Sequence, residues 1–98
     1  TVLGACGTAY AMRYIRANIQ GGIEIGFDAV TATLIAAQTV KGAAELLLQK
    51  GTHPEQEIDK VTTPKGCTIA GLNEMEHQGF SSSLIKGIAT SYNKIVKG

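Results

Sequence analysis

The segment Thr62–Thr68 holds the side chains best suited to bind a ligand, because it combines threonine hydroxyls, a glycine and the start of an expected helix. Gly66 lets the backbone come close to a ligand, since it has no Cβ. The first N–H groups of a helix have no intrahelical acceptor and point outward at its positive end. The hydroxyls of Thr63 and Thr68 can donate further hydrogen bonds. The pattern predicts an anion site, and a carboxylate is the natural ligand.

The same residues have a second interpretation, in which Thr63 or Thr68 simply caps the helix. A threonine hydroxyl often accepts a hydrogen bond from the second or third N–H group of a helix. Because every helix start offers similar groups, spacing alone favours the capping interpretation. The residues by themselves leave both interpretations open.

Other places that could carry chemistry have simpler explanations. The run Gly4–Thr8 has no Lys-Ser/Thr pair, follows no strand and holds no G-x-G-x-x-G, so we expect a loop before a helix rather than a phosphate loop. His53 and His77 lie far apart, without cysteine or carboxylate neighbours at ligand spacing, and no metal site is predicted. Glu74 and Glu76 lie on different faces of one helix and are expected to be solvated. No Ser-His-Asp or Cys-His set can be assembled.

The overall composition restricts the class of protein. Charged residues make up 17% of the 98 residues and hydrophobic residues 44%, so too few charges are present to cover a small monomer. We therefore expect part of the apolar surface to be buried against a partner. The net charge of +1 comes from scattered basic residues, which argues against nucleic-acid binding.

The sequence shows no sign of a membrane span or a signal peptide. It begins at Thr1 without a methionine, which is consistent with a piece of a longer protein. Cys6 and Cys67 form no C-x-x-C pair and have no histidine at zinc-finger spacing. We expect two free thiols in a reducing compartment, and hence a cytoplasmic protein.

Glycine and proline divide the chain into five expected helices, and no stretch shows the alternation of a strand. The helices are expected at residues 7–25, 28–50, 54–61, 69–78 and 81–97. Asp28 and Ser81 are suitable N-caps. The pair Gly21-Gly22 lowers helix propensity, which indicates a close approach to a neighbouring helix.

The second expected helix indicates how the protein assembles. Between Ala29 and Leu48 its only charged residues are Lys41 and Glu45. With Gln38 and Gln49 they form one narrow polar stripe, and the rest of this stretch is apolar or small. A helix that is apolar around most of its circumference is buried on most sides. A chain this short surrounds such a helix most easily by forming a dimer.

Several segments resemble the C-terminal domain of pyrroline-5-carboxylate reductases in order and spacing. They are Ala-Ala-Gln-Thr-Val-Lys-Gly-Ala-Ala at 36–44, Val-Thr-Thr-Pro-Lys-Gly-Cys-Thr-Ile-Ala-Gly-Leu at 61–72, Gly-Phe at 79–80 and Gly-Thr-Ala-Tyr at 7–10. The last of these is similar to the family's G-P-A-Y helix start. The resemblance covers essentially the whole chain, and the first two segments are specific when they occur together.

The resemblance implies that the whole protein reduces 1-pyrroline-5-carboxylate to L-proline with NADPH or NADH, in the last step of proline biosynthesis. It implies that an N-terminal Rossmann domain, which this chain lacks, binds the cofactor. Residues 1–98 would form one all-α domain similar to the C-terminal domain of 6-phosphogluconate dehydrogenase. This domain would interlock with its twin in an intertwined homodimer, and some family members stack dimers into decamers. The fragment alone would be inactive.

The resemblance also assigns roles to residues of Thr62–Thr68. Thr63 and the backbone N–H groups of Cys67 and Thr68 would hold the substrate carboxylate, with Gly66 allowing the close approach. Thr68 would be the catalytic residue, because its hydroxyl would hydrogen-bond the ring nitrogen as hydride reaches the imine carbon. The fragment is expected to contain no cofactor-binding residue and no metal ligand.

Lys65 and Thr8 depart from the family pattern, which usually has glycine and proline at these positions. Lys65 either adds a charge near the substrate carboxylate or points into solvent. Cys67 stands where a small residue is common and is expected to contribute only its backbone. Two alternatives remain open: a free-standing helical interaction module whose threonine-rich loop is only a cap, and another dehydrogenase of the 6-phosphogluconate-dehydrogenase-like class.

Overall fold

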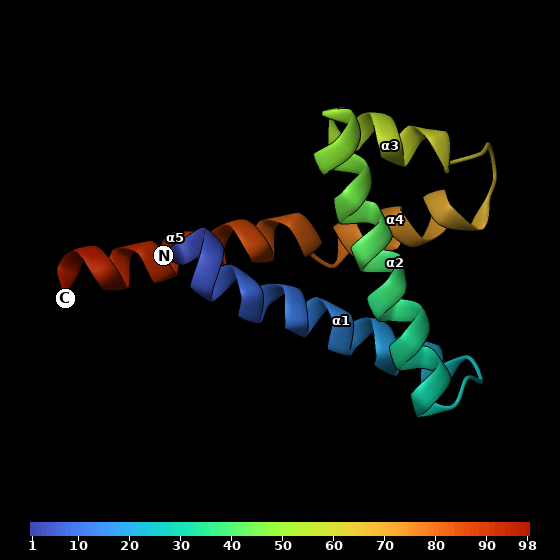
Figure 1. The fold of residues 1–98 in the computed structure, drawn as a ribbon, viewed down its shortest axis with the longest axis horizontal. Helices are drawn as coiled ribbons and strands as arrows, with labels where there is room; N and C mark the ends of the chain where they lie inside the picture. The colour runs from blue at the N-terminus through green and yellow to red at the C-terminus, as the bar shows by residue number, and fades with distance from the viewer. The chain divides into compact units, whose positions relative to one another are not determined.

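The computed structural model describes residues 1–98 and consists of five α-helices without a strand. The helices are α1 (Gly7–Glu24), α2 (Ala29–Lys50), α3 (Pro54–Lys60), α4 (Cys67–His77) and α5 (Phe80–Lys97), and a short π-helical turn, η1 (Val2–Cys6), precedes α1 (Figure 1). The predicted all-α fold with about five helices is thus confirmed. No helix has the combination of length and apolar character needed to cross a membrane. The chain divides into two compact units, Gly4–Thr52 and His53–Gly98, the latter with Thr1–Leu3.

The first unit is a helical hairpin, in which α1 and α2 meet at a tight turn (Figure 1). Gly26 ends the first helix in a backbone conformation with φ of 120°, which favours glycine. Asp28 is the N-cap of α2, as predicted, since its Oδ1 accepts a hydrogen bond from the Thr31 N–H at 3.3 Å. Gly51 ends α2 with φ of 64°, and its N–H donates to the Leu47 carbonyl at 3.0 Å.

The two helices of this hairpin approach each other at Gly22. A Cβ at this position would lie 3.2 Å from the Cβ of Ala32, while a Cβ at Gly21 would meet nothing within 4 Å. Ala32 and Ala36, on the facing side of α2, are the two buried residues of the chain. The expected close approach is therefore confirmed for Gly22, and glycine against alanine is what allows it.

We expect opposite effects from substitutions at the two neighbouring glycines. Gly22→Val should lower the free energy of unfolding by about 1–3 kcal/mol, because the added methyls would be forced against Ala32. Gly21→Ala should raise it by up to about 1 kcal/mol, because alanine favours the helix and has free space. Urea unfolding of both variants measures the difference. Equal changes in the free energy of unfolding for the two variants would contradict the assignment of Gly22 as the residue that contacts Ala32.

The second unit runs from α3 through a loop to α4 and then α5. The chain reverses direction between α3 and α4, and α5 continues roughly along the direction of α4 after a bend at Gly79 (Figure 1). Pro54 occupies the start of α3, with Glu55 and Glu57 in its first turn, as predicted. Lys94 and Lys97 lie in the last turn of α5, where they complement the negative end of the helix.

The predicted N-cap of α5 at Ser81 is wrong, because the helix begins at Phe80 and its N-cap is Gly79, with φ of 87°. Ser81 instead donates to the carboxylate of Glu76 through its hydroxyl at 2.9 Å and its N–H at 3.3 Å. The carboxylate satisfies an N–H group that the helix leaves free. Glu76 therefore joins α4 to α5 and is not simply solvated. Glu74 also has a partner, since it accepts from the Gln78 side chain at 2.9 Å.

The segment before α1 also differs from the expected loop. Residues 2–6 form the π-helical turn η1, which runs directly into α1. Thr8 supports this turn, since its hydroxyl donates to the carbonyl of Gly4 at 2.9 Å. A proline at this position could make no such bond and its ring would clash with that carbonyl.

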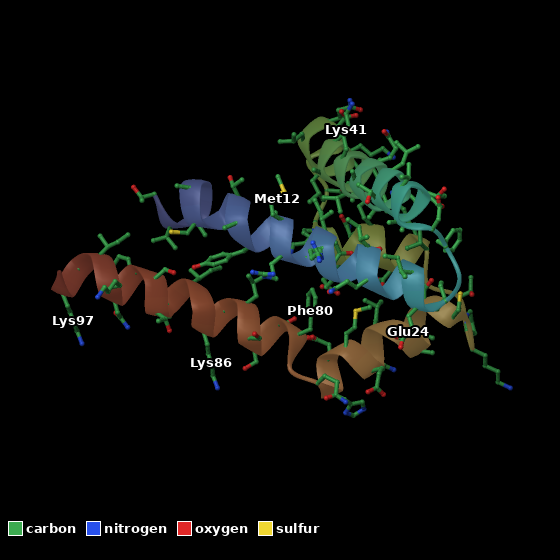
Figure 2. The ribbon with its side chains drawn as sticks, turned by 90° about the horizontal axis from the view of Figure 1, so that it is seen from below. Met12, Glu24, Lys41, Phe80, Lys86 and Lys97 are labelled. Carbon is green, nitrogen blue, oxygen red and sulfur yellow. The ribbon has the colours of Figure 1, made fainter.

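Most large apolar side chains of both units are exposed. In α5 they form one stripe, and the exposed fractions of Ile85, Tyr92 and Ile95 are 65%, 58% and 53%. Lys86 and Lys97 extend together from another side of α5, and Phe80 points away from them (Figure 2). In α2, Leu34 is 68% and Ile35 48% exposed. No side chain of the unit His53–Gly98 is buried, so this single chain leaves its amphipathic helices without a core.

Candidate functional site

The loop between α3 and α4 contains a tight turn that places the candidate residues. The N–H of Gly66 donates to the carbonyl of Thr63 at 3.0 Å, and Pro64 and Lys65 lie between them. Lys65 has φ of 61° and is the single non-glycine residue with a positive φ. Proline at the second position and a positive φ at the third are typical of a type II β-turn. The turn leads directly into Cys67, the first residue of α4.

Gly66 leaves space for the side chain of Thr63 at the end of this turn. Its φ of −79° is open to any residue. A Cβ there, however, would lie 2.5 Å from the hydroxyl oxygen of Thr63 and 3.1 Å from its carbonyl oxygen. The side chain of Thr63 therefore rests against the N-cap residue of α4, and only glycine leaves room for it.

Helix α4 begins at Cys67, two residues earlier than expected, so Cys67 and Thr68 form its first turn. No side chain caps this helix. The capping interpretation of Thr63 and Thr68 is therefore wrong, because Gly66 occupies the N-cap position and Thr68 lies inside the first turn of the helix. No hydrogen bond within the chain uses the N–H groups of Cys67 and Thr68 or the two threonine hydroxyls. The start of α4 offers unused donors.

The one charge on this loop favours an anion. Lys65 is the one charged residue between Lys60 and Glu74. Of the acidic residues on α3, which are Glu55, Glu57 and Asp59, Glu57 is paired with Lys60 at 3.3 Å. Thr63, Lys65 and Cys67 are exposed, and Thr68 is half-buried. Unpaired N–H donors at the positive end of a helix and two hydroxyls are groups that bind a carboxylate.

The remaining candidate residues form no second site. His53 is the N-cap of α3: its Nδ1 accepts from the Glu55 N–H at 3.1 Å, and its own N–H donates to the Gln56 side chain at 3.3 Å. A polar residue before proline, with glutamine three residues later, is a capping signal that could have revealed this role from the sequence. No group of His, Cys, Asp and Glu side chains is placed to hold a metal ion. Cys6 and Cys67 are free thiols.

Several known proteins have sequences and folds similar to those of this chain. Residues 1–97 match the family model described as pyrroline-5-carboxylate reductase dimerisation. Pyrroline-5-carboxylate reductase 1 of Dictyostelium discoideum is 68% identical over 94 residues, which cover 96% of this chain and 17% of that protein.

Two solved structures have the same fold. The 1-pyrroline-5-carboxylate reductase of Streptococcus pyogenes matches with a TM-score of 0.92 at 32% identity, over 96% of this chain and 36% of that one. The pyrroline carboxylate reductase of Plasmodium falciparum, with NADP bound, matches with a TM-score of 0.91 at 26% identity, over the same shares. This chain thus spans roughly a sixth to a third of the length of these proteins. With the family model matching nearly every residue, the chain belongs to the pyrroline-5-carboxylate reductase dimerisation family.

Proposed function

We propose that this chain is the dimerisation and substrate-binding part of a reductase that converts 1-pyrroline-5-carboxylate to L-proline, in the last step of proline biosynthesis. The observation that carries the proposal is the start of α4, where the N–H groups of Cys67 and Thr68 and the hydroxyls of Thr63 and Thr68 are all unused within the chain. The names of its relatives support the reaction. The substrate is a cyclic imine with one carboxylate, so it presents an anion and a ring nitrogen.

The substrate carboxylate is proposed to bind at the N-terminal end of α4. The N–H groups of Cys67 and Thr68 would donate to its oxygens, and the Thr63 hydroxyl would add a third donor. Gly66 allows this arrangement, because its missing Cβ leaves the Thr63 side chain room beside the helix end. Hydrogen bonds to a charged oxygen are shorter and stronger than neutral ones. Cys67 needs only its backbone for this role.

Thr68 is proposed to act on the reacting part of the substrate. A threonine hydroxyl can donate to the ring nitrogen and fix the plane of the imine. During the reduction, hydride adds to the imine carbon, the π-electron pair of the C=N bond moves to the nitrogen, and the nitrogen takes up a proton from water. A donor at this atom therefore matters most in the transition state. Thr68 is half-buried in this chain, which limits competition from water.

A nicotinamide cofactor, NADPH or NADH, is proposed as the hydride donor. The NADP bound in the structure of the Plasmodium falciparum relative supports this class of cofactor. The fold of residues 1–98 does not fit the group, because a dinucleotide site is built on a βαβ unit and this chain has no strand. The cofactor site would belong to the larger remaining part of the reductase, and we propose that the whole protein is cytoplasmic.

A homodimer is proposed as the assembled state, intertwined through these helices and, in some members of the family, extended to a decamer. The description of the matching family as a dimerisation domain supports it. So do the exposed apolar stripe of α5 and the absence of buried residues in the unit His53–Gly98. A second copy would supply the missing core and remove these side chains from water.

The test is an assay of the full-length protein that contains this chain. We expect it to oxidise NADPH or NADH when 1-pyrroline-5-carboxylate is added, with L-proline as the product. Residues 1–98 alone should show no activity. A full-length protein that binds and reduces no cyclic imine carboxylate would overturn the proposed reaction.

Gly66→Ala should weaken substrate binding in the full-length enzyme. The new methyl would meet the Thr63 hydroxyl and push it away from the end of α4, so we expect KM to rise about tenfold, the cost of losing a hydrogen bond to a charged group. Gly71→Ala is the matched control, because a Cβ at this position of α4 meets nothing within 4 Å. Steady-state kinetics decide, and similar KM values for the two variants would contradict the role of Gly66.

A further inference from the structure

We propose that Lys65 is a substrate-attracting residue of the reductase, whose ammonium group favours binding of the anionic substrate electrostatically without forming part of the donor set at α4. This inference rests on the proposed function. It goes beyond it by adding a side chain that neither the turn nor the helix start requires.

The backbone of Lys65 is in an unusual conformation for its residue type. Its φ of 61° lies in the left-handed region, and every other residue with a positive φ in this chain is a glycine. An L side chain costs free energy there because its Cβ comes close to a backbone oxygen, and glycine avoids this cost. The turn from Thr63 to Gly66 would form more readily with glycine at the third position. The lysine side chain therefore occupies a position at which the backbone conformation favours glycine.

The charge of Lys65 is the only one on the loop. From residue 61 to residue 73 no other side chain carries a charge, and Lys65 makes no hydrogen bond or ion pair within the chain. The nearby ion pair of α3 uses Lys60 and Glu57 instead. The Lys65 ammonium is thus not neutralised by a local carboxylate. It adds to the positive end of α4, whose N–H groups are two and three residues away along the chain.

The ammonium group of an exposed lysine acts on a charged ligand mainly through long-range electrostatic attraction. At about 0.01 M ionic strength the Debye length is about 30 Å, and at about 1 M it is about 3 Å, so an exposed ammonium attracts a carboxylate strongly only at low salt. Such an interaction changes binding by a factor of about two to five, which is the upper part of the range for exposed ion pairs. It should act on KM for the substrate and leave kcat unchanged, because the charge of the carboxylate is the same before and during the reaction.

The test uses three variants of the full-length reductase. Lys65→Gln removes the charge and keeps the stem, Lys65→Gly removes the charge and also relieves the left-handed backbone, and Lys65→Arg keeps the charge. At low salt we expect Lys65→Gln and Lys65→Gly to raise KM for 1-pyrroline-5-carboxylate about twofold to fivefold, with Lys65→Arg close to wild type. These differences should disappear at about 1 M salt.

The glycine variant separates a binding role from a structural one. It should melt about 1–4 °C higher than the wild type, since the strained residue is gone, while its KM rises. If the role of Lys65 were only structural, its substitution would change the melting temperature and leave KM unchanged. Equal KM values at low salt, a difference that persists at high salt, or no rescue by arginine would each overturn the proposal for Lys65. A wild-type enzyme without reductase activity would instead overturn the proposed function.

Discussion

Thr68→Ala is expected to lower kcat of the full-length reductase about 100-fold while KM changes by less than about threefold. The proposed hydroxyl contact to the ring nitrogen strengthens as this atom gains an electron pair, so its loss should be felt in the transition state and little in the bound substrate. The carboxylate would still be held by the N–H groups of Cys67 and Thr68, which alanine retains. Steady-state and single-turnover kinetics with 1-pyrroline-5-carboxylate measure both constants.

The structure allows a clean control for this experiment. The Thr68 hydroxyl makes no hydrogen bond within the chain, so its removal should leave the thermal midpoint nearly unchanged. Thr68→Ser keeps the hydroxyl and should retain most of kcat, which separates the hydroxyl from the lost methyl. Thr90→Ala removes a hydroxyl that donates to the carbonyl of Lys86 at 2.8 Å on α5, and it should leave the kinetics unchanged. If kcat of Thr68→Ala equals that of the wild type, Thr68 has no part in the mechanism.

A charged residue introduced into the apolar stripe of α5 is also expected to have a large effect, in this case on dimer formation. Ile85→Glu should weaken the dimer by about 2–5 kcal/mol, since it would bury an unpaired carboxylate in the proposed interface. In a single chain the same change should cost little, because Ile85 is 65% exposed there. Multi-angle light scattering at micromolar concentration should therefore find a dimer for the wild type and a smaller mass for the variant.

Asn93→Glu is the matched control, since Asn93 is exposed on the polar side of the same helix. It introduces the same charge outside the apolar stripe and should remain a dimer. Circular dichroism should accompany the measurement, because an intertwined dimer loses helix when its partner is removed. A wild type that is monomeric at micromolar concentration, or an Ile85→Glu variant that dimerises as tightly as Asn93→Glu, would disprove the proposed interface.

Local rules were enough to predict most helix ends. Asp28 caps α2 and Gly51 ends it, because a carboxylate at the N-cap and a left-handed glycine after the last turn are set by a few neighbouring residues. The same rules placed the cap of α5 incorrectly at Ser81. They do not include Glu76, five residues earlier on another helix, whose carboxylate takes both donors of Ser81.

Residue types and their spacing were sufficient to establish the all-α class, the positions of five helices, the excess of apolar surface and the resemblance to pyrroline-5-carboxylate reductases. Each depends on composition, on contacts within one or two turns of a helix, or on motif spacing. The folded chain was needed to show that Gly22 touches Ala32, that Gly66 makes room for Thr63, and that neither Thr63 nor Thr68 caps α4. These outcomes depend on where backbone segments come together and on the φ of Lys65 in the turn, and residue spacing does not specify either. The threonines are candidates for binding a substrate because the turn leaves their hydroxyls unused.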